Sequence, residues 1–264
     1  MDFHVHTSFS MDCLVPMEDM ARYALERRGQ KMICFTDHID LDHPYKPFDV
    51  DGDTYLRKIA SVQERFPGIK LLAGLEIGYT APTHDRLVEK AASVPLDFIL
   101  LSRHVINGID PLDIYSYFSG KSRLEAYREY MLAVWESIQA FPDYDAVAHI
   151  GYVVKNAPYK REQIPLTYQD LPDLWDAILK YLAQHGKALE INTSVYEDMG
   201  DGIPGFDVIH RFHELGGEWV TLGSDAHAPA GVAQGFEDCI QRLQKEGYRY
   251  VASFEKRKLI PIPI

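Results

Sequence analysis

Short apolar segments alternate with longer amphipathic segments along almost the whole chain. Seven of the short segments are rich in β-branched, leucine or aromatic residues. Uninterrupted apolar runs of this length are typical of strands that are buried on both faces. The predicted strands are Met1–His6, Lys31–His38, Ile69–Gly78, Asp97–His104, Tyr144–Gly151, Lys187–Thr193 and Glu218–Ser224.

Six segments, five between these strands and one after the last of them, place apolar residues at helical spacing, and several end at glycine, a common helix terminator. The predicted helices are Pro16–Arg28, Asp53–Phe66, Ser122–Phe141, Leu171–His185, Phe206–Leu215 and Phe236–Glu246. This alternation predicts a parallel sheet. The 264 residues suit closure of that sheet into one α/β barrel domain, which typically needs about 250 residues.

The remaining segments are expected to be connections and a tail. Residues 107–121 and 152–170 each follow a predicted strand, and connections of this length often bind ligands. The proline-rich residues after Glu255 are expected to be extended.

Composition and charge narrow the classes of function. Hydrophobic residues make up 46% of the chain, enough for a large core, so a bound metal would serve chemistry rather than folding. The net charge of −12 argues against nucleic-acid binding, which depends on lysine and arginine. An anionic substrate would therefore need local positive charge, and metal ions can supply it.

Cysteine usage and the N-terminal sequence favour a cytoplasmic protein without a membrane partner. The three cysteines form no CxxC pair and are expected to be reduced. The N-terminal segment has no basic region followed by an apolar stretch, and no apolar run is long enough to span a bilayer. The oligomeric state is left open.

Eight potential metal ligands lie at or just beyond the ends of predicted strands, where barrel enzymes carry their active sites. They are His4, His6, His38, Glu76, His104, His149, Asp225 and His227. Residues two apart on a strand share a face, so each His-x-His or Asp-x-His pair can reach one ion. Either pair alone is a weak signal, but the whole set predicts a metal site. Such ligands suit Zn²⁺, Mn²⁺ or Fe, and ligand type does not choose among them.

The segments that carry these ligands resemble the motifs of the PHP (polymerase and histidinol phosphatase) superfamily, in their usual order and over nearly the whole chain. The resemblance is greatest to the histidinol-phosphatase branch, and it implies a distorted (β/α)7 TIM-like barrel with three divalent metal ions. The motifs are Asp2-Phe3-His4-Val5-His6-Thr7, Thr36-Asp37-His38, Gly74-Leu75-Glu76, Ser102-Arg103-His104, Ala148-His149, Leu189-Glu190-Ile191-Asn192 and Gly223-Ser224-Asp225-Ala226-His227.

The resemblance also implies a ligand set for each ion, in which Glu76 bridges the first two and Asp12 enters from a loop. Metal one would take His4, His6, Glu76 and Asp225; metal two Glu76, His104 and His149; metal three Asp12, His38 and His227. Among these, the expected catalytic residues are Glu76, Asp225 and His227.

Residues around the metals are expected to orient ligands or to bind substrate. Asp37 is expected to orient a ligand histidine, and Glu190 either does the same or has a structural role. Phosphate-binding candidates are Lys155, Arg161 and Arg103, with a solvated charge as the alternative for the two loop residues Lys155 and Arg161. Carboxylates for the cationic end of a substrate are expected from Glu197 and Asp198.

The resemblance implies hydrolysis of a small phosphomonoester, with metals that neutralise the phosphate and make hydroxide available near neutral pH. L-Histidinol phosphate, an intermediate of histidine biosynthesis, is the favoured substrate. The residues at Arg103, Gly151 and Val195 differ from the usual branch pattern and leave a nucleotide, a sugar phosphate or phosphotyrosine open. A third alternative is a non-catalytic metal-binding accessory domain, against which the complete ligand set argues.

Overall fold

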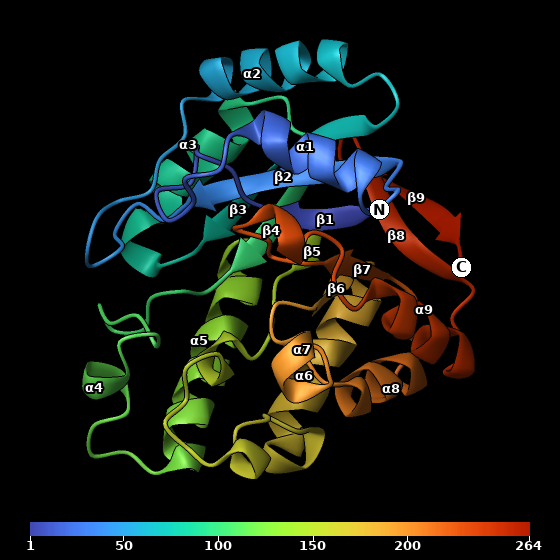
Figure 1. Cartoon of the computed structure of the whole chain (residues 1–264). Helices are drawn as coiled ribbons and strands as arrows, with labels where there is room; N and C mark the ends of the chain where they lie inside the picture. Colours follow the sequence, from blue (N-terminus) through green and yellow to red (C-terminus); the bar gives the residue numbers. More distant parts are fainter.

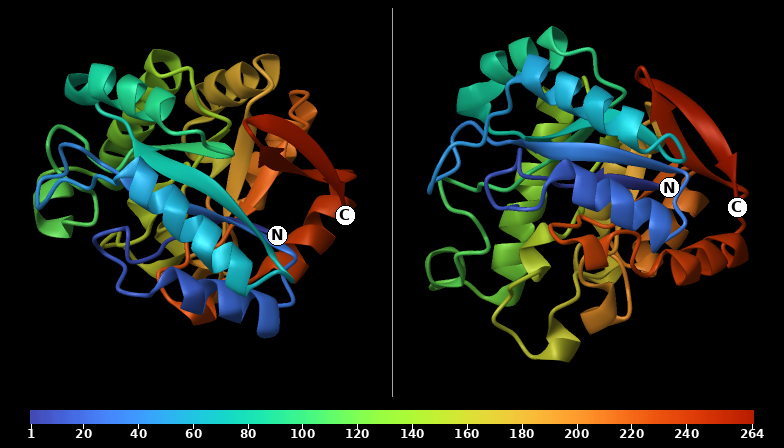
Figure 2. Two further views of the ribbon diagram at one scale, coloured as in Figure 1. Left: turned by 90° about the horizontal axis from the view of Figure 1, so that it is seen from above. Right: turned by 45° about the horizontal axis from the view of Figure 1, so that its top comes forward.

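Seven parallel strands form the centre of the protein, and each pairs with the next along the chain (Figure 1). This computed structural model describes residues 1–264. The strands are β1 (Asp2–Val5), β2 (Met32–Ile39), β3 (Lys70–Gly78), β4 (Phe98–Ser102), β5 (Ala146–Val147), β6 (Ala188–Asn192) and β7 (Val220–Gly223). The sheet curves into a nearly closed barrel with helices around it (Figure 2). The predicted (β/α)7 barrel and its seven strands are confirmed.

Helices cover the outside of the barrel, and the six predicted ones are present within two residues of their expected ends. The helices are α1 (Met17–Glu26), α2 (Gly52–Arg65), α3 (His84–Ser93), α4 (Ile114–Tyr117), α5 (Arg123–Ala140), α6 (Pro172–Gln184), α7 (Tyr196–Met199), α8 (Phe206–Glu214) and α9 (Phe236–Lys245). The start of α5 shows the local cause, because Ser122 and Glu125 form a reciprocal capping box there. None of these helices is long and apolar enough to cross a lipid bilayer.

Helix α3, the short helices α4 and α7, and the strand β8 (Tyr250–Glu255) were not predicted. Helix α3 buries only Leu87 and Ala91, so its apolar periodicity is too sparse to be noticed in the sequence. The tail is extended as expected, and it forms a strand, β9 (Lys258–Pro263), that pairs antiparallel with β8. Both termini lie beside this hairpin in Figure 1.

The β8–β9 hairpin covers the N-terminal end of the barrel strands. Phe254 packs against Phe3 and Phe98, with ring centroids 6.4 and 5.2 Å away, inside a small apolar cluster. The hairpin turn is held by Asp145, which accepts hydrogen bonds from Arg257 Nε at 2.5 Å and from the Ile99 amide at 2.8 Å. With this end filled by apolar side chains, the opposite end of the barrel is left for polar groups.

The first and last barrel strands meet through a buried carboxylate. Asp2 accepts hydrogen bonds from the amides of His4, Ser224 and Ala233 and from the Ser224 hydroxyl, at 2.6–3.2 Å. A short bridge between Val5 and Ala226 continues the contact beyond the ends of both strands. Asp2 therefore connects the start of the chain to its last quarter and closes the barrel.

Replacing Asp2 with alanine is expected to lower the free energy of unfolding by roughly 2–4 kcal/mol, because buried amide donors lose their acceptor. Denaturant titration followed by circular dichroism measures this change. Asp53→Ala, at an exposed position of α2, is the matched control and should cost less than about 1 kcal/mol. If the free energy of unfolding falls equally in the two variants, the hydrogen bonds of Asp2 contribute no more to stability than an exposed carboxylate does.

Candidate metal centre

The fully buried carboxylate of Glu76, on β3, lies at the centre of a ring of histidines at the C-terminal end of the barrel. Imidazole nitrogens lie within 3.4 Å of its two oxygens. Oε2 faces His4, His6 and His38, whereas Oε1 faces His104 and His149. The strands bring these residues together because each histidine stands at, or within two residues of, a strand end. One carboxylate thus offers a separate oxygen to each of two groups of imidazoles.

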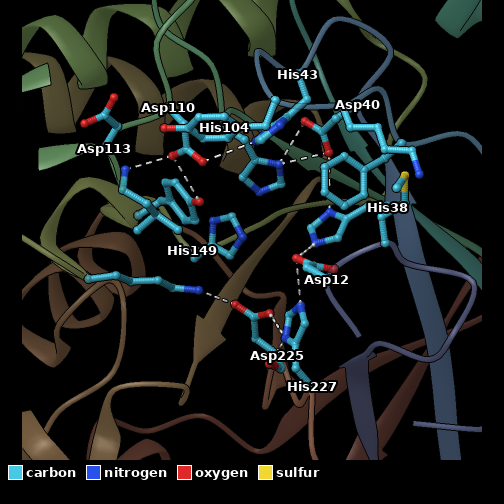
Figure 3. Close-up of a pocket in the computed structure, with 17 residues that line it drawn as sticks. Asp12, His38, Asp40, His43, His104, Asp110, Asp113, His149, Asp225 and His227 are labelled. Carbon is cyan, nitrogen blue, oxygen red and sulfur yellow. Dashed lines mark hydrogen bonds and ion pairs between the residues drawn. The ribbon is translucent and has the colours of Figure 1, made fainter. Parts of the chain in front are cut away.

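Two further carboxylates, Asp225 and Asp12, connect this ring to His227 (Figure 3). Asp225 Oδ1 lies 3.2 Å from His6 Nε2 and 3.6 Å from His227 Nδ1. Asp12 Oδ2 lies 3.2 Å from His227 Nε2 and 3.5 Å from His38 Nε2. The loop residue Asp12 therefore joins the other candidate ligands. All nine residues of the expected ligand set converge on one site.

A second set of carboxylates contacts the histidines on the side of the ring that faces away from Glu76. Glu190 Oε1 lies 2.6 Å from His4 Nδ1, and its other oxygen accepts the His149 amide at 2.7 Å. Asp40 lies 3.0 Å from His104 Nδ1, which directs Nε2 of that ring to Glu76. Contacts of this kind fix the tautomer and the orientation of a ligand histidine.

Asp37 contacts a candidate ligand histidine indirectly, through Ser10, in line with its expected orienting role. Asp37 Oδ1 accepts hydrogen bonds from the Ser10 amide and hydroxyl at 3.0 and 2.7 Å, and Ser10 Oγ lies 3.1 Å from His6 Nδ1. The sequence did not indicate Asp40, because nothing local shows that β2 brings its side chain to His104. The only available sign was its position two residues after His38, just past the strand.

Burial and close charges shift the pKa values at this site in opposite directions. Burial lowers the pKa of His6 well below its ordinary value. Burial acts the same way on His104, but Asp40 and Glu76 outweigh it and raise its pKa to about 10. Burial also disfavours ionised Glu76, yet the surrounding imidazoles hold its pKa well below the usual range. The buried carboxylates therefore attract positive charge, which divalent cations supply in metal sites.

The donor set fits divalent metal ions. In four groups of three residues, one ligand atom from each lies within 4.8 Å of the others. These groups are His6/His38/His227, His4/Glu76/His149, His4/His6/Asp225 and His38/Asp40/His104. His6 Nε2 is buried without a hydrogen-bond partner, as expected of a nitrogen atom that coordinates an ion. The mixture of imidazole and carboxylate suits zinc, manganese or iron.

A cavity of about 560 Å³ opens above these side chains, a volume suited to a small organic ligand. His38, His104, His149 and Asp225 line its base, together with Lys155 from the connection after β5. The Lys155 ammonium pairs with Asp225, so it lies beside the candidate metal ligands. Of the three predicted phosphate-binding residues, Lys155 is the one that the fold brings to the cavity.

Arg103 and Arg161 do not line the cavity. Arg103 turns away from the cavity: its guanidinium donates to the Val105 carbonyl, two residues along the chain, at 2.8 Å and pairs with Glu136 of α5 at 3.3 Å. Arg161 is exposed and donates to the carbonyl of Asp198. Both arginines already have partners elsewhere, which corrects the expectation that they bind substrate.

Glu197 and Asp198 are also absent from the cavity wall, because both are exposed on the short helix α7. The carboxylates at the far end of the cavity are instead Asp110 and Asp113, on the connection after β4. The sequence analysis predicted only a long connection there, since nothing local indicates which of its residues turn inward.

The PHP domain family matches residues 2–194 of this chain. The chain belongs to the PHP domain family. This match ends before Asp225 and His227, but similarity to whole PHP proteins continues past them. The histidinol-phosphatase of Lactococcus lactis is 30% identical over 263 residues, which cover 98% of this chain and 96% of that protein.

This PHP chain is also similar to proteins whose structures have been solved. A crystal structure of the Lactococcus lactis histidinol phosphate phosphatase, in complex with zinc, L-histidinol and phosphate, has a TM-score of 0.91 at 30% identity and 98% coverage of both chains. A structure of metal-dependent tyrosine phosphatases from Bacillus subtilis and Streptococcus pneumoniae has a TM-score of 0.51 at 17% identity, covering 93% of this chain and 87% of that one. The second likeness shows a shared fold and leaves the substrate undecided.

Proposed function

We propose that this chain is a phosphoric monoester hydrolase that converts L-histidinol phosphate and water to L-histidinol and phosphate. The observation that carries the proposal is the Glu76-centred ring of histidines at the base of a ligand-sized cavity. Similarity to histidinol-phosphatases over 98% of the chain supports the choice of substrate. The complete donor set argues against a non-catalytic accessory domain.

The proposed cofactor is a cluster of three divalent ions, of zinc, manganese or iron. Glu76 would bridge two of them through its two oxygens, as the division of its imidazole neighbours between Oε1 and Oε2 supports. Asp12, His38 and His227, which all line the cavity, would hold the third. The remaining ligand assignments are those implied by the family resemblance.

The protein's own groups position the phosphate in this proposal. Divalent metals bound at the site supply Lewis acidity, which neutralises phosphate charge and makes water a stronger acid. Lys155 donates a hydrogen bond to a phosphate oxygen from the side of Asp225, where its ammonium already lies. Asp225 and Glu76 keep their negative charge at neutral pH, because nearby cationic groups hold both pKa values well below the usual range despite burial.

We further propose that residues 1–264 form a single barrel domain. The β8–β9 hairpin packs into the same end of the barrel as Phe3 and Phe98, and Asp2 joins the first strand to residues after the last one. Candidate ligands also come from both ends of the chain, from His4 to His227.

The wild-type protein is expected to hydrolyse histidinol phosphate with a kcat/KM at least about 10²-fold above that for p-nitrophenyl phosphate, since a site built for one substrate rejects poorly matched ones. Steady-state kinetics with Mn²⁺- or Zn²⁺-loaded protein measure this ratio. The panel should include nucleotides, sugar phosphates and phosphotyrosine. A higher kcat/KM for any of these compounds than for histidinol phosphate would identify that compound as the preferred substrate.

A further inference from the structure

The cavity has a polar group at the end opposite Lys155 that the proposed chemistry does not use. Asp110 lies on the connection between β4 and α4, and only 7% of its side chain is exposed. In Figure 3 the ring of His149 lies between Asp110 and Asp225. The hydrogen-bond partners of the Asp110 side chain are His43, Leu112 and Tyr152, none of which is a candidate metal ligand, so this buried carboxylate is free to recognise a group of the substrate.

Tyr152 sets the distance between Asp110 and the metal centre. Its ring packs on the rings of His104 and His149, with centroids 4.9 and 5.3 Å away, and its hydroxyl donates to Asp110 Oδ1 at 3.3 Å. The carboxylate therefore stands one phenol ring away from the candidate metal ligands. A substrate whose phosphate lies at the metals reaches Asp110 only through a group several bonds from its ester oxygen.

Asp110 has room for one more donor. A carboxylate accepts about four hydrogen bonds, and three donors are present. The Leu112 amide and Tyr152 hydroxyl donate to Oδ1, at 2.8 and 3.3 Å, and His43 Nε2 lies 3.3 Å from Oδ2. The remaining acceptor position is on Oδ2, beside the cavity.

The walls near Asp110 suit a flat ring. Phe48 contacts the rings of His38 and His43, with centroids 5.3 and 5.0 Å away, and lines the cavity, as the aromatic side chain of Tyr152 also does. Leu112 adds an apolar surface. Two aromatic walls and a carboxylate at the edge match a nitrogen heterocycle that offers an N–H at its rim.

We propose that Asp110 accepts a hydrogen bond from the imidazole N–H of histidinol phosphate. This contact would make the enzyme specific for the histidinol part of the ester. This assignment rests on the proposed function. The imidazole suits the position better than the ammonium, because the ammonium is borne by the carbon next to the phosphorylated CH₂ and so stays near the metals. Asp110 thus takes the role that Glu197 and Asp198 were expected to have.

The test compares two substrates in one variant. Asp110→Asn should lower kcat/KM for histidinol phosphate by roughly 10- to 100-fold, the loss expected for one charge-assisted hydrogen bond. Hydrolysis of p-nitrophenyl phosphate, which has no N–H to offer, should stay within about twofold of wild type. L-Histidinol should also become a weaker inhibitor of p-nitrophenyl phosphate hydrolysis. Asp198→Asn, an exposed carboxylate outside the cavity, is the matched control and should leave both substrates unchanged.

A second arm uses the unaltered protein and so does not depend on the folding of the variant. Two analogues of histidinol phosphate, each methylated on a different imidazole nitrogen, are compared with the parent compound. The analogue that blocks the N–H facing Asp110 should lose kcat/KM by a factor similar to that of the variant.

The outcomes separate the two proposals. Suppose that wild type prefers histidinol phosphate. If Asp110→Asn keeps that preference, or if its kcat/KM falls equally for both substrates, the role of Asp110 is overturned and the proposed function stands. Undiminished turnover of both methylated analogues would also overturn the role of Asp110. If wild type shows no preference for histidinol phosphate, the proposed function fails, and the imidazole subsite fails with it.

Discussion

Glu76→Gln is expected to reduce turnover of histidinol phosphate by roughly 10³-fold or more, a loss at the upper end of that seen when one charged group is removed from a reaction centre. Both oxygens of Glu76 face imidazole nitrogens, three on one side and two on the other. Glutamine keeps one oxygen and replaces the other with an amide that points donor hydrogens at these nitrogens. It therefore cannot serve two ions.

Elemental analysis and kinetics of the same Glu76→Gln preparation measure this effect. The bound metal should fall by more than one ion per chain, while circular dichroism and cooperative unfolding are retained, because the apolar core is independent of the site. Glu197→Gln, an exposed glutamate, is the matched control and should behave as wild type. Normal turnover with a full metal complement in the Glu76 variant would contradict the bridging role.

Removing metal with a chelator is expected to abolish turnover, with a residual rate below about 1% of the starting value, because Lewis acidity is lost from the whole site. Activity should return with Zn²⁺, Mn²⁺ or Fe²⁺ and not with Mg²⁺ or Ca²⁺. The histidine-rich donor set explains the difference, since Mg²⁺ and Ca²⁺ prefer oxygen ligands.

The chelation experiment needs a metal balance at each step. Atomic absorption should find three ions per chain in the active protein and less than about 0.1 in the inactive one, with thermal unfolding still cooperative in the latter. Recovery that reaches its plateau at three equivalents supports the proposed cluster. Full turnover by protein that contains no measurable metal would refute metal dependence altogether.

The barrel and the candidate ligands were accessible from the sequence because both depend on local patterns. Apolar runs mark strands buried on both faces, and eight of the nine candidate ligands lie at or near the ends of such runs, so the C-terminal edge of the sheet brings them together. Asp12, which lies in a loop, was implied only by the family resemblance. The features that escaped prediction depend on distant contacts. Asp40 contacts His104, which is 64 residues later in the chain. Residues 250–255 form the strand β8 only because they pair with the C-terminal strand β9.

The direction of long side chains was equally beyond the sequence. Arg103 stands beside the candidate ligand His104, and position alone favoured the cavity, yet its guanidinium donates to the Val105 carbonyl and to Ser137 of α5. The same limit applies to Asp110, since a long connection does not show which carboxylate turns inward. Substrate recognition therefore has to be inferred from the folded protein, whereas the metal site follows from strand ends.

Closure of the barrel through Asp2 has a consequence for the order of folding during synthesis. Asp2 hydrogen-bonds to Ala233, 231 residues later, and the donors at His4 and His6 face Asp225. Contacts with such large sequence separation form late, because the chain between them must first be ordered. Until about nine tenths of the protein has left the ribosome, the first strand has no closing partner. A nascent chain should therefore acquire metal only near the end of translation.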